Sequence, residues 1–274
     1  MTNPIDDTKK GLDIVVELVK AAGENPQVKE AGQNLGQAAL TITKTINIAL
    51  LPLAAVNFGY DKAKVYFSEK FQEDLLKKAN SIPQESIIEP KPSIAGPVLQ
   101  GLAFTHEEPN LKDMYLNLLV AAMDGRGSEK VHPAYVEIIK QLNSKEAGFL
   151  KVVLTYPSSL PIVEVRRNIP GQTVYNVLLK HLLNNCDEKT KEPVEDPLLP
   201  AMVDNWIRLG LAEVDYSKWL NDDNYYSWVT NRPEFKKLVV RNNNENKQVT
   251  FQRGILSKTA FGFQFAQAVG ISQI

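Results

Sequence analysis

The stretch Pro109-Asn-Leu-Lys-Asp-Met-Tyr-Leu-Asn-Leu-Leu-Val-Ala-Ala-Met-Asp124 decides how this chain is built. Its apolar residues recur at intervals of 3, 1, 3, 1 and 3, which places them on one face of an α-helix. They are Leu111, Met114, Tyr115, Leu118, Leu119 and Ala122. Pro109 suits a first helical turn, and Asp124-Gly125 ends the pattern. This segment predicts a core made chiefly of packed helices.

A second helical stretch, residues 31–60, contains a single charged residue, Lys44. Its apolar and small residues follow one another at alternating steps of 4 and 3, a period that favours lengthwise packing on another helix. They are Leu35, Ala39, Ile42, Ile46, Ala49, Leu53 and Val56. Ile48, Leu51 and Ala55 lie off this seam, so we expect burial on more than one side. Pro52 should kink the helix or end its first half.

Three roles are open for the helix over residues 31–60. It can be a core helix of a bundle, a membrane-inserting or membrane-lying effector helix, or a contact with another protein chain. The candidate residues for a membrane or partner contact are Ile42, Ile46, Leu50 and Leu53. The longest uncharged run, residues 45–60, has 16 residues, whereas a membrane span needs about 20 apolar residues. A helix lying on the membrane surface tolerates Lys44.

Most of the remaining chain up to residue 155 also favours helices. Leu12, Val15, Val16 and Val19 indicate a first amphipathic helix. Residues 81–97 hold four prolines and predict an extended connection. Further on, His132 should accept a hydrogen bond from a backbone amide at the start of a helix. Asn143 and Glu146 predict a capping box for the helix that follows.

The pattern changes near residue 156, where strands begin to alternate with helices. We expect strands over residues 161–166, 211–215, 225–229 and 247–251, and helices over 173–184, 199–209 and 259–269. Together with the preceding helix, this is the order of a winged helix-turn-helix. The predicted fold is therefore mainly α: a helical bundle over residues 1–143, followed by a small winged-helix-like α+β region over residues 144–274.

Composition places the chain among ordinary globular proteins. Of its 274 residues, 43% are apolar and 23% are charged, and the net charge is −1. A general nucleic-acid or anionic-membrane binder would carry a basic excess. The lone Cys186 excludes an internal disulfide, and the N-terminus lacks the pattern of a secretory signal. We expect a cytoplasmic protein, with membrane association open through the helix over residues 31–60.

Catalytic and metal-binding motifs are weak in this sequence. His106-Glu107-Glu108 has no second histidine four residues on, so it does not form a zinc-hydrolase motif. Residues 125–128 lack the spacing and the Gly-Lys-Ser/Thr ending of a phosphate loop. The residues around Cys186 do not clearly favour a thiolate. We expect a protein that is not an enzyme and that needs no cofactor or metal.

DNA binding is the alternative that the winged-helix order raises. Residues 1–143 carry a net charge of −3 and residues 144–274 a net charge of +2. The expected recognition helix, residues 199–209, offers only Arg208, whereas a DNA reader needs several phosphate contacts. The expected wing supplies Arg241, Lys247 and Arg253 as candidate nucleic-acid contacts. A winged helix used as a protein-contact module explains these charges better.

Two segments, residues 115–124 and 131–142, resemble the Abi-alpha family, and residues 207–211 and 256–265 are similar to its C-terminal part. The resemblance implies bacterial phage defence of the abortive-infection type. It implies no catalytic motif. We therefore expect a defence protein that acts by contact with a phage or host protein, with a membrane-perturbing effector and a DNA-binding regulator as alternatives. The trigger, the target and the oligomeric state stay open.

Overall fold

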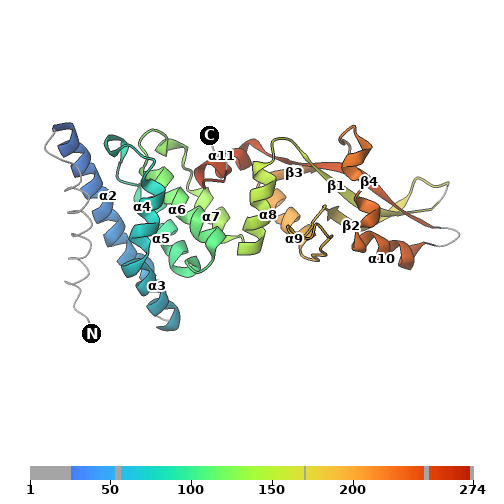
Figure 1. Ribbon diagram of the computed structural model, residues 1–274, viewed down its shortest axis with the longest axis horizontal. Helices are drawn as coiled ribbons and strands as arrows, with labels where there is room; N and C mark the ends of the chain where they lie inside the picture. Colours follow the sequence, from blue (N-terminus) through green and yellow to red (C-terminus); the bar gives the residue numbers. More distant parts are fainter. Residues whose placement is uncertain (1–25, 53–56, 170, 244–246, 272–274) are drawn as a thin grey trace. The chain divides into compact units, whose positions relative to one another are not determined.

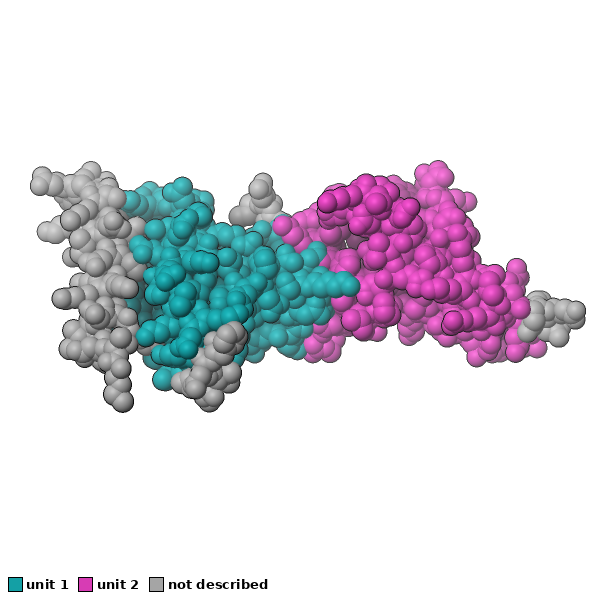
Figure 2. Space-filling model, turned by 60° about the horizontal axis from the view of Figure 1, so that its bottom comes forward, with its two compact units in different colours: residues 1–148, 264–274 teal, residues 149–263 magenta. Residues whose placement is uncertain are grey.

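The computed structural model describes residues 26–52, 57–169, 171–243 and 247–271 (Figure 1). These residues form a mainly helical protein that also contains a four-stranded antiparallel sheet. The chain divides into two compact units, coloured separately in Figure 2. Unit 1 comprises residues 1–148 and 264–274, and unit 2 comprises residues 149–263.

Unit 1 has its core at two helices, α5 (Pro92–Thr105) and α6 (Pro109–Met123), which pack against each other. Gly101 allows this close approach, because a Cβ atom there would overlap the ring of Tyr115. The core residues along the two helices include Val98, Leu99, Leu102, Leu118 and Leu119. The other elements of unit 1 are α2 (Pro26–Leu50), α3 (Asn57–Glu69), α4 (Phe71–Ala79), η2 (Gln84–Ser86), η3 (Ser128–Lys130), α7 (Ala134–Lys140), the start of α8 (Ser144–Thr155) and the end of α11 (Ala260–Ala268).

Unit 2 is built on the sheet, whose strand order is β2-β1-β4-β3. The strands are β1 (Leu160–Asn168), β2 (Tyr175–Leu182), β3 (Ala212–Asp215) and β4 (Gln248–Lys258). The helical elements are α9 (Leu199–Arg208), η4 (Asp223–Tyr226), η5 (Val229–Asn231) and α10 (Pro233–Asn242). The core of unit 2 forms where η4, η5 and α10 pack on the sheet. Its buried residues are Val163, Val165, Leu182, Tyr226, Val229, Phe235 and Val249.

The prediction for residues 31–60 is confirmed in part. Helix α2 ends at Leu50, just before Pro52, as a proline at that position requires. Ile42 and Ala49 are buried, but Ile48 is 65% exposed and Leu51 is 67% exposed. Burial on more than one side is therefore wrong for the described part of this helix. Residues 53–56, with the seam residues Leu53 and Val56, lie outside the described residues.

The extended connection predicted over residues 81–97 is wrong at its end. Helix α5 begins at Pro92 and runs through Pro97. A proline in a first turn sacrifices no intrahelical hydrogen bond, whereas Pro97 does and costs about 3 kcal/mol or more. The apolar residues on both sides of Pro97 are buried, so the gain from packing offsets that cost.

The helix predicted over residues 173–184 is also wrong, because these residues form the edge strand β2. Its first half, Tyr175–Val177, is exposed, and Leu182 enters the core. Val174, Tyr175 and Val177 are better suited to a strand than to a helix, and β1 pairs with this segment from Tyr175 onward. Tertiary pairing therefore decides the structure here.

The region between β3 and β4 differs most from the expected order. Residues 225–229 were expected to form a strand and instead belong to η4 and η5, with Tyr226 and Val229 both turned into the core. Helix α10 follows, at a position where no element was expected. The structure therefore does not confirm a winged-helix-like arrangement. The expected strand over residues 247–251 is the start of the longer β4.

Several local predictions are confirmed. Helix α6 begins at Pro109 and ends at Met123, α9 covers residues 199–208, and α11 covers residues 260–268. The amide of Glu146 donates to Asn143 Oδ1 at 2.8 Å, which is one half of the expected capping box. The first amphipathic helix, predicted from residues 12–19, lies outside the described residues.

Candidate functional site

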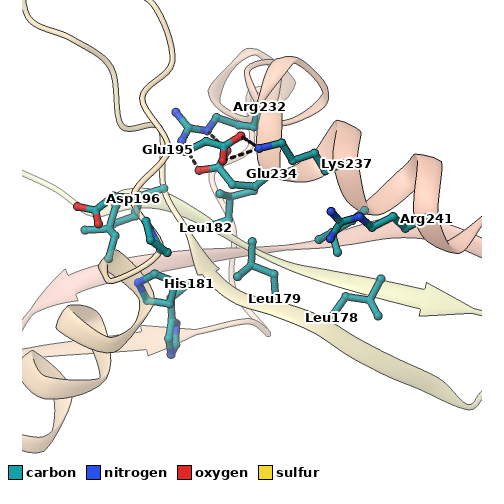
Figure 3. Close-up of a pocket in the computed structure, with 15 residues that line it drawn as sticks. Leu178, Leu179, His181, Leu182, Glu195, Asp196, Arg232, Glu234, Lys237 and Arg241 are labelled. Atoms are coloured by element: carbon teal, nitrogen blue, oxygen red, sulfur yellow. Dashed lines mark hydrogen bonds and ion pairs between the residues drawn. The ribbon is translucent and has the colours of Figure 1, made fainter.

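Unit 2 contains a pocket of about 290 Å³ between β2, the segment 195–200 and α10 (Figure 3). Its apolar wall is made by Leu178, Leu179, Leu182, Leu183, Leu199 and Leu238. Strand β2 supplies the first three of these leucines, and α10 supplies Leu238. Two prolines, His181 and six charged side chains line the rest of the pocket, so it combines an apolar wall with polar groups.

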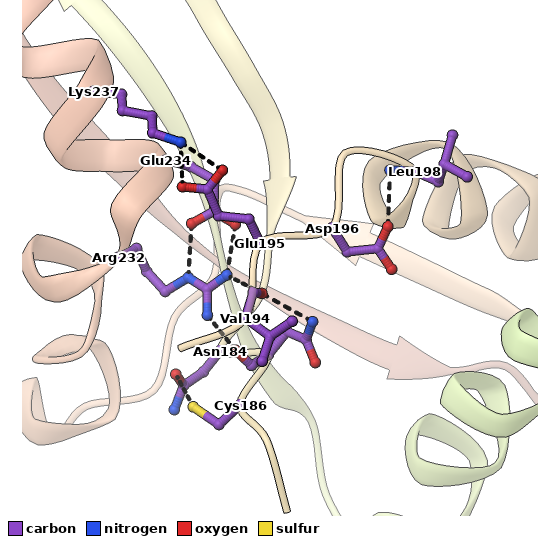
Figure 4. A network of polar contacts seen from close by, with 10 residues as sticks. Asn184, Cys186, Val194, Glu195, Asp196, Leu198, Arg232, Glu234 and Lys237 are labelled. Atoms are coloured by element: carbon purple, nitrogen blue, oxygen red, sulfur yellow. Dashed lines mark hydrogen bonds and ion pairs between the residues drawn. The ribbon is translucent and has the colours of Figure 1, made fainter. Parts of the chain in front are cut away.

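Arg232 is the most deeply buried charged residue at this pocket, with 1% of its surface exposed. It lies directly before Pro233, the first residue of α10. Its Nε donates to Glu234 Oε2 at 3.1 Å, and its Nη2 donates to Glu234 Oε1 at 2.6 Å (Figure 4). The guanidinium also donates to the carbonyls of Val194, at 2.9 Å, and of Asn185. Arg232 therefore joins α10 to the segment that leads into α9.

The outer rim of the pocket carries a second ion pair. Lys237 Nζ donates to both carboxylate oxygens of Glu195, at 2.7 and 2.8 Å. Both side chains are well exposed, so this pair contributes little to stability. Arg241, one helical turn beyond Lys237, also lines the pocket and is exposed. It forms no ion pair with any residue that the structure describes.

His181 lies at the end of β2 and also lines the pocket. Its backbone amide donates to Tyr216 Oη at 3.1 Å, and its Nδ1 lies 3.1 Å from the same oxygen. Since Tyr216 Oη already accepts from the amide, its hydroxyl can donate to Nδ1. The ring hydrogen is then on Nε2, which lies 3.1 Å from Asp204 Oδ1. We assign this tautomer from the hydrogen bonds.

The pKa values fit a structural role for this chain of polar groups. Burial lowers the pKa of His181 below its ordinary 6.5, and the Asp204 carboxylate opposes that change. Burial raises the pKa of Tyr216 to about 12. At neutral pH the imidazole is therefore uncharged and the phenol is protonated, and both ring nitrogens of His181 already have hydrogen-bond partners.

The residues predicted for a membrane or partner contact on the helix over residues 31–60 do not form an exposed face. Ile42 and Leu50 are buried inside unit 1, and Ile46 is half-buried. Leu53 lies outside the described residues. The exposed face of α2 carries other residues, namely Leu40, Lys44 and Ile48, and Leu51 directly after the helix is exposed as well. Any contact by this helix would therefore use a different face from the one expected.

The residues predicted for a nucleic-acid wing do not share one hairpin. Arg241 lies in the last turn of α10, while Lys247 and Arg253 belong to the segment that forms β4. Arg253 Nη1 donates to Asp223 Oδ1 at 2.6 Å, so its charge is matched within unit 2. Only Arg241 reaches the pocket.

The other candidates from the sequence have local roles. His132 Nδ1 accepts from the amide of Ala134 at 3.1 Å, which confirms that it opens α7. His106 stacks on Tyr66, with 5.0 Å between the ring centroids. Cys186 Sγ donates to Asn184 Oδ1 at 3.4 Å. Within the described residues, no group of three or more His, Cys, Asp or Glu side chains could hold a metal ion.

Sequence reasoning missed the main residues of the pocket. Lys237 belongs to α10, which was not expected, and Arg232 directly precedes that helix. The stretch over residues 173–184 was predicted to be a helix and is a strand. One signal was available: Arg232-Pro233-Glu234 has the proline and the acidic residue of a first helical turn. The position of Arg232 beside two carbonyls of a distant loop has no comparable signal.

Fold and site together define an α+β protein of two units, with a small apolar pocket in the unit that holds the sheet. Residues 63–269 match the family model described as "Abortive infection alpha". This match covers most of the chain, so the protein belongs to the abortive infection alpha family, as the resemblance indicated. Neither a search of curated proteins nor a search of solved structures found a match. None of the described helices is both long and apolar enough to cross a bilayer.

Proposed function

We propose that the chain is a phage-defence protein of the abortive-infection type that acts by contact with a phage or host protein. Family membership supports the defence role. The pocket of unit 2 supports the contact mode, and it is the observation on which this part of the proposal depends. Its apolar wall suits the side chain of a partner, because interface anchors fill small desolvated pockets.

The polar groups around the pocket favour binding over catalysis. Arg232 is held by Glu234 and two backbone carbonyls, and Lys237 is held by Glu195. His181 is enclosed between Tyr216 and Asp204. General acid–base catalysis needs a titratable group that is free to exchange a proton with a substrate. We therefore propose that the chain is not an enzyme and that unit 2 serves as a contact module.

The defence part is tested by phage infection of a bacterial host that expresses the full chain. We expect fewer plaques, and early death of infected cells, relative to a host with an empty vector. The same plating efficiency in both hosts, across a panel of unrelated phages, would contradict this part.

The contact part is tested by photo-crosslinking in infected cells. A photoreactive phenylalanine analogue replaces Lys237 at the pocket or, as a matched control, its neighbour Lys236, which is exposed but does not line the pocket. We expect one protein adduct that depends on infection and forms from position 237 only. Adducts of equal yield from both positions would contradict contact at the pocket.

One observation favours a second candidate, a helix that lies on a membrane. On α2, Leu40 and Ile48 are exposed on the same face as Lys44, as in an interfacial helix, and Leu51 directly after the helix is also exposed. Cell fractionation with and without infection tests this role, using a variant with Ile48→Asp and Leu51→Asp. These side chains are exposed, so the variant should fold. Membrane association that appears on infection and is lost in the variant would support this candidate over contact by the pocket.

DNA binding through Arg241, Lys247 and Arg253 is not our proposal. Arg253 is paired with Asp223, and Arg208 on α9 donates to Asn205 of the same helix. We therefore propose that unit 2 contacts a protein and not DNA.

A further inference from the structure

We infer that the pocket of unit 2 binds an acidic segment of a partner protein, in which one large apolar side chain enters the pocket and a neighbouring carboxylate pairs with Arg241. This inference rests on the proposed contact function and names the chemistry of the partner. Three features of the pocket carry it: its size, its wall and the charge at its rim.

The size of the pocket suits one anchoring side chain. Its volume of about 290 Å³ is at the lower end of the range for small-molecule sites, about 300–1,000 Å³. A single leucine, isoleucine, methionine or phenylalanine side chain would be surrounded by the leucines of β2 and α10, as anchors at protein interfaces are.

The residues of the pocket wall do not favour a nucleotide as the ligand. The residues that line the pocket include six leucines and no Phe, Tyr or Trp. Single-stranded nucleic acids are held largely by bases stacked on aromatic rings, and the one aromatic ring in this lining, the His181 imidazole, is buried and hydrogen-bonded at both nitrogens. An apolar protein side chain matches the wall without leaving polar groups buried and unsatisfied.

At one end of the rim, Arg241 carries a positive charge that no described carboxylate pairs with. Arg232 pairs with Glu234, and Lys237 pairs with Glu195, whereas Arg241 has no carboxylate partner among the described residues (Figure 3). Arg241 is exposed, so its guanidinium is accessible to a partner. A partner carboxylate next to the anchoring side chain would complement this charge, and electrostatic complementarity selects partners.

The test uses the full chain and a library of random seven-residue peptides displayed on yeast cells. We expect selection with the wild type to enrich peptides that have Leu, Ile, Met or Phe within two residues of Asp or Glu. Selection with Arg241→Glu should instead enrich Lys or Arg at the acidic position. The control Lys236→Glu makes the same charge change on the same helix, away from the pocket, and should select the same peptides as the wild type.

A selected peptide is then measured by fluorescence anisotropy. We expect Arg241→Glu to weaken its binding at least tenfold and Lys236→Glu to change it less than twofold. Tryptophan fluorescence, which reports on unit 2, shows that each variant is folded. The inference is overturned if no peptide is enriched, or if Arg241→Glu selects the same peptides as the wild type. Displacement of the peptide by a labelled DNA duplex, with the same dependence on Arg241, would favour a nucleic-acid ligand instead.

Failure of this inference and failure of the proposed function are separable. Infection-dependent crosslinking from position 237, without any preference for acidic peptides, would reject only the partner chemistry. A clear preference for acidic peptides in a chain that gives no phage protection would reject the defence role and leave the binding site in place.

Discussion

Units 1 and 2 bury different kinds of side chain. Unit 1 closes around α5 and α6, whose inward residues are almost all aliphatic, and Glu146 is the one charged side chain buried in its described part. Unit 2 buries Arg232, Glu164, His181 and Asp196. Buried ionic groups contribute little net stability, although removing one partner costs several kcal/mol. Unit 1 is thus held mainly by apolar packing, whereas unit 2, where we propose the binding site, also buries ionic groups.

The positions of the tryptophans allow the unfolding of the two units to be measured separately. All three tryptophans, Trp206, Trp219 and Trp228, belong to unit 2. Tryptophan fluorescence therefore reports on unit 2 alone. Circular dichroism at the helical band reports mainly on unit 1, which holds most of the described helices.

The largest effect is expected from Arg232→Ala, which removes the buried guanidinium and leaves Glu234 and two carbonyls without their donor. We expect a loss of about 3–5 kcal/mol in the free energy of unfolding of unit 2. Urea unfolding followed by tryptophan fluorescence measures it. Lys237→Ala breaks the exposed pair with Glu195 and should cost about 1 kcal/mol or less. Equal losses in the two variants would contradict the role of Arg232.

In unit 1, Gly101→Ala should destabilise the packing of α5 on α6. The added methyl group would overlap the ring of Tyr115, which is fully buried and has no room to move. We expect a loss of about 1–3 kcal/mol, measured by circular dichroism during urea unfolding. Gly96→Ala lies on the same helix and meets only Thr45 Cγ2, at 3.8 Å. Gly96→Ala should leave stability unchanged or raise it by up to about 1 kcal/mol. A larger loss of stability from Gly96→Ala than from Gly101→Ala would refute the close packing at Gly101.

The stability of unit 2 should fall as the pH drops below about 6.5, in part because of His181. The pKa of His181 is lowered in the folded protein, so below pH 6.5 the unfolded chain binds the proton more readily. Above that pH both states are neutral at this residue, and it contributes nothing to the pH dependence. His181→Asn tolerates the positive φ of 56° and removes the titrating group. Between about pH 7.5 and pH 5.5 the variant should lose less stability than the wild type, and an identical loss would exclude His181 as a contributor.

The smallest effect is expected at the start of α7. His132→Ala removes the acceptor for the amide of Ala134, and loss of such a cap costs about 0.5–1 kcal/mol. His132→Asn keeps a side-chain acceptor at the same position and should restore most of the stability. Thermal unfolding followed by circular dichroism distinguishes the two variants. If Asn destabilises as much as Ala, the imidazole serves by packing and not as a cap.

The sequence predicted unit 1 better than unit 2 for a physical reason. The bounds of α6, the cap at His132 and the end of α2 near Pro52 depend on residues close together in the chain. Strand β2 depends on pairing with β1, and η4 and η5 depend on Tyr226 and Val229 filling a core formed by distant residues. Where tertiary contacts decide the conformation, a local pattern of leucines or aromatic residues is ambiguous.

Arg241 is the only residue of the pocket that the sequence analysis named as a candidate site residue, and it was named as a nucleic-acid contact. Arg241 was selected for its positive charge. Its neighbours at the pocket come from β2, which was predicted to be a helix, and from α10, which was not predicted. The contact residues expected on α2 face inward at Ile42 and Leu50. A period near 3.5 identifies the face of a helix that packs, and here that face packs within unit 1.

Phage plating on hosts that express pocket variants tests the central claim most directly. We expect the wild type and Lys236→Glu to reduce plaque numbers equally, and the double variant Lys237→Glu with Arg241→Glu to lose that protection while the chain stays folded and at the same level in the cell. Full protection by the folded double variant would contradict the claim that the pocket of unit 2 is where this protein meets its partner.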